Sequence, residues 1–136
     1  MLYYIHRSEG KHLKTERIKS MKIVTTYVAF DDEEFSTMEA CQAYENFHMG
    51  LMIEAEDCYS FFDAGMHQIS LDYSHNVEEM LDTFTRAYDE CYYIIVKKKP
   101  SDNLKKFIRD YEGLILPVKE GIWYYNSVTS KWEKVT

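Results

Sequence analysis

The sequence predicts an α+β fold in which an antiparallel sheet built from hairpins packs against about three helices. Two patterns predict it. Short runs of β-branched and aromatic residues alternate with turn residues, and three longer segments repeat apolar residues every three or four positions. Hairpins pair their strands in antiparallel fashion, so the helices are expected to cover one face of the sheet. With 136 residues the chain has the length of about one domain.

The longest helix is expected between Ser36 and Asp57. Ser36 and Glu39 have the spacing of a capping box, in which the two side chains bond the free N–H groups of the first helical turn. Apolar residues then recur at three- and four-residue steps from Met38 to Cys58. This pattern predicts an amphipathic helix of about twenty residues.

Two shorter helices are expected later in the chain. Asn76 is a favourable N-cap for a helix whose apolar stripe covers residues 77–88. Ser101 or Asp102 is expected to cap the third helix. Gly113 is expected to end it, because glycine adopts the left-handed conformation common just after a helix.

The expected strands are rich in Val, Ile, Thr and aromatic residues. The unbroken apolar run at 91–96 is the best candidate for a central strand. Asp31 and Asp32 supply an early turn, and residues 126–130 join the last two strands as a hairpin. The strands, some with their turns, are expected at 2–5, 23–30, 33–35, 59–66, 68–71, 91–96, 114–118, 121–126 and 131–135.

Residues 1–20 are expected to form a basic N-terminal arm or extension, and residues 21–136 a single α+β domain. Met21 begins the segment MKIV, which resembles a natural start. The residues before it are mainly basic and polar beyond a short apolar run. Few Pro and Gly residues occur, so no flexible linker divides the remainder.

Charge is distributed in three blocks. The net charge is −7, but residues 1–22 and 91–136 each carry +4, whereas residues 31–90 carry −15. Solubilising charge is the plain interpretation, yet −15 over this segment exceeds what solubility requires. An acidic face of this kind is a candidate for docking on a basic partner surface. Its candidate residues are Asp31, Asp32, Glu33, Glu34, Glu78, Glu79 and Asp82.

The C-terminal hairpin is rich in aromatic residues. Alternate residues of a strand face opposite sides, so half of these rings are expected in the core and half on the outer face. The outer rings are candidates for a partner interface, because Tyr and Trp combine a large apolar area with a polar group. The candidate residues are Trp123, Tyr124, Tyr125 and Trp132.

No catalytic residue is assigned. Glycine-rich phosphate-binding loops are absent from the sequence. No recognisable nucleophile signature surrounds the cysteine and histidine candidates, which favours buried thiols and loop histidines. These candidates are Cys58, Cys91, His67 and His75. The sequence therefore favours a non-enzymatic protein, and no cofactor is expected.

A possible pocket is the main alternative on the long helix. Cys41, Glu45 and His48 share one helical stripe, but one helix presents three zinc ligands poorly, so no metal is expected. Cys41, Tyr44 and His48 are instead candidates for lining a pocket between the long helix and the sheet. The sequence would then encode a small-ligand-binding or sequestering protein, or a small enzyme.

One dense basic patch lies in the C-terminal third. Such patches can contact nucleic-acid phosphates. Three of its members share the solvent side of the expected third helix, and the chain as a whole is acidic, so direct nucleic-acid binding is disfavoured. The patch consists of Lys97, Lys98, Lys99, Lys105, Lys106 and Arg109.

The expected location is the cytoplasm of a bacterial host. Three cysteines without a CxxC motif favour a reducing compartment. The sequence has no run of 18 apolar residues and no secretory signal at its start, so no membrane partner is expected.

Two segments resemble small proteins of bacteriophages and prophages. They are residues 27–36 with the following Cys41, Tyr44 and Glu45, and the ending formed by residues 121–125 and Trp132. The resemblance extends loosely over 21–136 and rests on structural motifs: a short hairpin, a helix start and an aromatic hairpin. It implies a host-takeover or anti-defence factor that acts by binding.

The sequence is therefore compatible with three functions. The first is a non-enzymatic phage or mobile-element accessory protein that binds a host protein through its acidic, Tyr-rich surface. The second is the ligand-binding alternative described above. The third is a self-associating structural protein, a homo-oligomer whose oppositely charged blocks pair between subunits.

Overall fold

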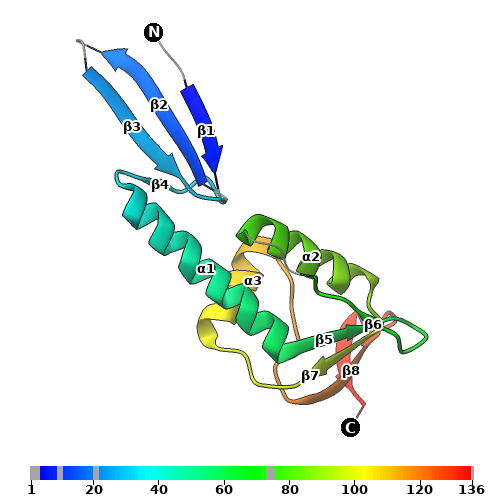
Figure 1. The fold of residues 1–136 in the computed structure, drawn as a ribbon. Coiled ribbons are helices and arrows are strands. Elements are labelled where there is room, and N and C mark those ends of the chain that lie inside the picture. Colours follow the sequence, from blue (N-terminus) through cyan, green and yellow to red (C-terminus); the bar gives the residue numbers. More distant parts are fainter. Residues whose placement is uncertain (1–3, 9–10, 20–21, 73–75, 136) are drawn as a thin grey trace. The chain divides into compact units, whose positions relative to one another are not determined.

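The computed structural model describes residues 4–8, 11–19, 22–72 and 76–135, which form nine strands and three helices (Figure 1). The predicted α+β class is confirmed. All strand pairs are antiparallel, and the strands form one four-stranded and one five-stranded sheet. The chain is divided into two compact units. The first unit comprises Met1–Gly50 and Ser74–Glu79, and the second comprises Leu51–Tyr73 and Met80–Thr136.

The first unit contains the four-stranded sheet, in the order β1-β2-β3-β4. Its strands are β1 (Tyr4–Ser8), β2 (Lys11–Lys19), β3 (Lys22–Val28) and β4 (Glu34–Phe35). The strand expected at 2–5 overlaps β1, although residues 2 and 3 lie outside the described residues. The described part of the expected basic arm thus supplies two strands. The division into an arm and a single domain stays a prediction.

The longest helix, α1, extends over Met38–Cys58 and leads directly into β5. Its N-cap is Thr37, whose Oγ1 accepts a hydrogen bond from the N–H of Ala40 at 3.2 Å. The expected cap at Ser36 is therefore wrong by one residue. Both side chains carry a hydroxyl group, and only the backbone geometry decides which of them caps the helix.

The other helices begin where the sequence predicts. Asn76 Oδ1 accepts the N–H of Glu79 at 2.9 Å and caps α2 (Val77–Glu90). Ser101 Oγ accepts the N–H of Leu104 at 3.2 Å and caps α3 (Asp102–Glu112). Gly113, with φ 68°, ends α3 in the left-handed conformation that glycine adopts without strain.

The second unit contains the five-stranded sheet, in the order β6-β5-β7-β8-β9. Successive residues of a strand face opposite sides, so this sheet has two distinct faces. One face packs against helices, since the Phe84 ring of α2 contacts Phe61 at 5.2 Å and Tyr59 at 6.4 Å. The strands are β5 (Tyr59–Phe62), β6 (Gln68–Ile69), β7 (Tyr93–Val96), β8 (Gly121–Asn126) and β9 (Lys131–Lys134).

The strand expected at 114–118 is not formed. Pro117 has no N–H to donate to a sheet, and its carbonyl accepts the Tyr59 hydroxyl at 3.0 Å. β7 pairs with β5 on one side and with β8 on the other, so it has no free edge for a further strand. The segment therefore passes as irregular chain between α3 and β8.

Candidate protein-docking surfaces

A tight acidic turn connects β3 with β4 in the first unit. Asp31 Oδ1 accepts the N–H of Glu33 at 3.2 Å, and the Ala29 N–H donates to the Glu33 carbonyl at 2.9 Å. Asp32 has φ 68°, a left-handed conformation that Asp tolerates better than most residues. The turn therefore has a fixed backbone, and the side chains of Asp32, Glu33 and Glu34 are exposed.

Tyr44 of α1 fastens this turn to the helix. Its hydroxyl donates a hydrogen bond to the Asp31 carboxylate. Burial, followed by the bond to Asp31 and nearby acidic charge, raises the pKa of Tyr44 well above its usual range. The phenol accordingly remains a donor at neutral pH and holds Asp31 in place, whereas the other three acidic residues of the turn stay exposed.

An aromatic cluster supports the turn. The Tyr44 ring lies 5.1 Å from Phe35 and 4.4 Å from His48, and His48 lies 5.3 Å from Phe30. Cys41, the third residue expected to line a pocket here, is fully buried. Tyr44 and His48 thus contact each other and their aromatic neighbours, and a ligand pocket at these residues stays a prediction.

The acidic residues predicted on α2 are exposed. Glu78, Glu79 and Asp82 lie on the solvent side of the helix, whose opposite side buries Val77 and Phe84. Two acidic residues in the first turn also suit the positive end of the helix dipole. Of the seven predicted acidic residues, Asp82 belongs to the second unit and the other six to the first.

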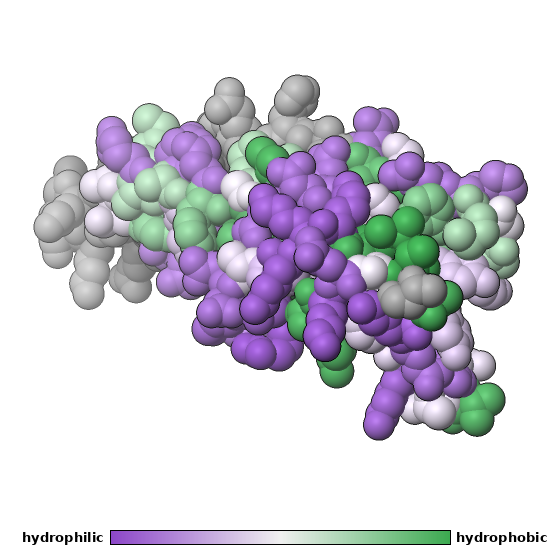
Figure 2. Space-filling model, turned by 90° about the horizontal axis from the view of Figure 1, so that it is seen from below, coloured by the Kyte–Doolittle hydropathy of each residue, from purple (hydrophilic) through white to green (hydrophobic). Residues whose placement is uncertain are grey.

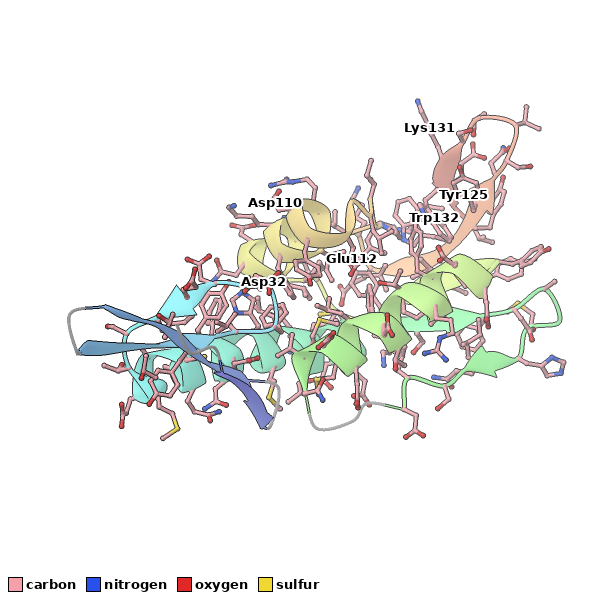
Figure 3. The ribbon with its side chains drawn as sticks, turned by 90° about the horizontal axis from the view of Figure 1, so that it is seen from above. Asp32, Asp110, Glu112, Tyr125, Lys131 and Trp132 are labelled. Carbon is pink, nitrogen blue, oxygen red and sulfur yellow. The ribbon has the colours of Figure 1, made fainter. Side chains whose placement is uncertain are left out.

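The aromatic residues of the C-terminal hairpin are divided between its two faces. Tyr125 and Trp132 are cross-strand partners whose rings are 5.5 Å apart, and Figure 3 shows them side by side. Trp132 also packs on Tyr88 of α2, to whose hydroxyl its Nε1 donates at 3.3 Å. Trp123 shares this face, and its Nε1 donates to the Lys119 carbonyl at 2.8 Å.

The opposite face of the five-stranded sheet carries Tyr124. The strand register places Phe62, Tyr93 and Tyr124 in one row across β5, β7 and β8, and Ile95 and Ile122 in the next row. Each of these five side chains is partly exposed, with Tyr124 at 37%. We call these five residues the open face. Figure 2 shows hydrophobic and paler residues gathered over these strands, at the right of the view.

Four residues of the open face were missed by sequence reasoning. The run at 91–96 is apolar throughout and predicts a central strand, but its pattern does not indicate which of its side chains stay partly exposed. The strand pairing of β5 with β7 and β8 brings Tyr93 and Ile95 beside Phe62 and Ile122. Ser60 of β5 pairs with Ile95 and therefore belongs to the second row. This polar residue is the sign in the sequence that the open face is less apolar than the opposite face.

The predicted basic patch has its charges partly paired. Lys106 Nζ lies 2.7 Å from Asp110 at exposed positions on α3, and Lys105 Nζ, which is partly buried, lies 3.1 Å from the exposed Asp102. Arg109 Nε also contacts Asp110, at 3.3 Å. These pairs are the arrangement expected of a solvated helix face.

The thiols are poorly suited to nucleophilic chemistry. All three cysteines are free, and Cys41 and Cys58 are buried. Burial raises the pKa of Cys58, and it raises the pKa of Cys91 to about 12, which keeps both in the thiol form at neutral pH. Within the described ranges, no three His, Cys, Asp or Glu residues are grouped so as to hold a metal ion. No helix in the described part of the chain is long and apolar enough to span a membrane.

Comparison of the chain with protein-family models, curated proteins and solved structures gives no match. The surfaces of this chain are therefore the basis on which its function is inferred.

Proposed function

We propose that the chain is a non-enzymatic accessory protein of the phage or mobile-element type that binds a host protein in the bacterial cytoplasm. The observation that carries the proposal is the acidic turn, whose carboxylates are exposed on a backbone fixed by Tyr44 and Asp31. A preorganised surface loses less conformational freedom when it binds than a flexible one. The partner surface that it fits is basic.

Charge selects the class of partner. Asp32, Glu33 and Glu34 stand next to one another, and the segment from 31 to 90 contains a single basic residue, Arg86. A negative surface of this kind increases the rate of encounter with positively charged grooves and rejects acidic ones. Host enzymes that handle nucleic acid, including defence enzymes, carry such grooves, so an anti-defence inhibitor is the form of accessory protein that we favour.

The open face supplies a second, apolar contact. Phe62, Tyr93 and Tyr124 offer aromatic area that is only partly covered. Tyrosine and phenylalanine are enriched in the buried centres of interfaces, whereas charged residues contribute mainly at the rim. Tyr124 is also oriented, because its hydroxyl donates to Glu133 at 3.1 Å.

The test is affinity capture from a bacterial lysate at about 0.1 M and about 0.5 M salt, the latter a condition in which the Debye length falls to a few ångströms. The wild-type protein is expected to retain a specific protein at low salt and to release it at high salt. Glu33→Lys/Glu34→Lys should fail to retain that protein. Glu56→Lys/Glu120→Lys, an equal charge change at exposed positions elsewhere, should retain it. Equal retention by both double variants would contradict the role of the turn.

A further inference from the structure

A cavity of about 150 Å³ opens in the second unit between α3 and the irregular segment 114–118. Its floor is apolar: Tyr59, Leu104 and Ile108 each line it and are at most 1% exposed. Leu114 and Leu116 of the irregular segment also line it. None of these residues belongs to the acidic turn or the open face, so the cavity is separate from the proposed docking surfaces.

The walls of the cavity are held in place from two sides. The Tyr59 hydroxyl donates to the Pro117 carbonyl at 3.0 Å, which attaches the segment 114–118 to β5. At the other side, Glu54 of α1 accepts the backbone N–H of Ser101 at 2.7 Å and its hydroxyl at 2.8 Å. Because Ser101 is the N-cap of α3, these bonds fix the start of the helix that lines the cavity. The cavity is therefore formed in advance of any ligand.

Two cations stand among the lining residues. Lys105 and Arg109 are one helical turn apart on α3 and both line the cavity. Their acidic neighbours Asp102 and Asp110 are exposed, so these ion pairs contribute little stability and can exchange for another carboxylate. Figure 3 shows Asp110 on the outer side of α3.

Size and charge together define the ligand. A dry protein cavity of about 150 Å³ with an apolar lining is large enough to take up benzene, and the cavity here has that volume. We propose that it binds small monocarboxylates that carry an aromatic ring or a short branched alkyl chain. The ring or chain enters between Leu104, Ile108 and Leu116, and the carboxylate lies against Lys105 and Arg109, where guanidinium binds it in bidentate fashion.

The surroundings favour a monoanion with an apolar end. Asp102 and Asp110 next to the two cations would repel a phosphate dianion more strongly than a carboxylate. Ile115 is 78% exposed beside the cavity, and Val118 is partly exposed. A bound ring would cover part of this apolar surface, which adds to its affinity.

The experiment is a titration of the full chain, followed by amide chemical shifts, with three benzene derivatives: phenylacetate, benzyl alcohol and phenethylamine. We expect a phenylacetate dissociation constant on the order of 1 mM, given the size of the ligand. Benzyl alcohol should bind about tenfold more weakly, because it lacks the charge-assisted bonds, and phenethylamine weaker still. Shifts should be confined to α3 and residues 114–118.

Matched variants separate the two parts of the site. Arg109→Gln should raise the dissociation constant of phenylacetate about tenfold. Lys106→Gln, which removes the same charge from α3 at a position outside the cavity lining, should leave it unchanged. Leu116→Phe, which fills the cavity, should abolish binding of all three compounds while the far-ultraviolet spectrum stays unchanged. Equal binding of phenylacetate and benzyl alcohol, an unaltered constant in Arg109→Gln, or no binding of phenylacetate would each overturn the proposal.

Discussion

The two faces of the five-stranded sheet come from the same strands and differ in how completely they are covered. On the face toward the helices, Phe61 and Ile94 are fully buried. On the open face, Phe62 and Tyr93, which are their neighbours in the chain, are partly exposed although they too are large apolar or aromatic residues. Hydrophobic composition alone therefore does not distinguish core residues from surface residues in these strands. The covered face stabilises the unit, and the open face is available for a partner.

The largest expected effect is on the free energy of unfolding, when Phe61 on the covered face and its neighbour Phe62 on the open face are each replaced by alanine. Phe61→Ala should lower the free energy of unfolding by about 3–5 kcal/mol, because it leaves a cavity beneath Phe84. Phe62→Ala should cost about 1 kcal/mol or less, since its ring is already partly solvated. Urea denaturation of both variants measures the difference. Equal losses would mean that the open face is covered as well as its opposite.

The reactivity of the three cysteine thiols tests how well the interior of the protein is shielded from solvent. With Cys41 and Cys58 buried and the pKa of Cys91 raised to about 12, the native protein should react with a thiol reagent at pH 8 at least about a hundredfold more slowly than the unfolded chain. A raised pKa means that thiolate appears only as pH approaches that value, so the native rate should rise steadily between pH 8 and 10. Fast reaction of one thiol at pH 8 would show that its site is open.

Tyr44→Phe extends the comparison to the acidic turn. Removing the hydroxyl leaves Asp31 without its donor from α1, which should cost about 1–2 kcal/mol in the free energy of unfolding. It should also weaken partner binding, because the turn loses its fixed backbone. Tyr92→Phe is the matched control at an exposed tyrosine and should change stability by less than about 0.5 kcal/mol. A stability change in Tyr44→Phe no larger than this control would show that the bond does not hold the turn.

Gly50→Ala should have the smallest effect and the opposite sign. Gly50 lies inside α1, and a β-carbon built there meets, among the described residues, no atom within 4 Å apart from the backbone of its own helix. Alanine reduces the entropy lost on forming the helix, so the free energy of unfolding should increase by about 0.5–1 kcal/mol. Thermal denaturation followed at 222 nm measures it. A decrease in stability would indicate that the space beside Gly50 is occupied in solution.

Local signals in the sequence predict most of the elements and few of the surfaces. The caps at Asn76, Ser101 and Gly113 are correct because each depends on one side chain and its own helix. The cap at Ser36 is missed by one position, since adjacent Ser and Thr have nearly the same propensity.

The surfaces depend on contacts between distant parts of the chain. The strand at 114–118 fails because Tyr59, 58 residues away from Pro117, takes its carbonyl. The open face requires the pairing of β5 with β7, and the cavity requires α3 and β5 to meet. No periodicity within one segment contains this information, whereas the exposed acidic turn could be anticipated from four consecutive acidic residues.

The most direct test of the account is a calorimetric titration of the host protein retained in the capture experiment. We expect Glu33→Lys/Glu34→Lys to weaken binding and to flatten its salt dependence. We expect Tyr124→Ala to weaken binding about tenfold or more with the salt dependence unchanged. Affinities equal to the wild type in both variants, or the absence of any protein retained specifically, would contradict it.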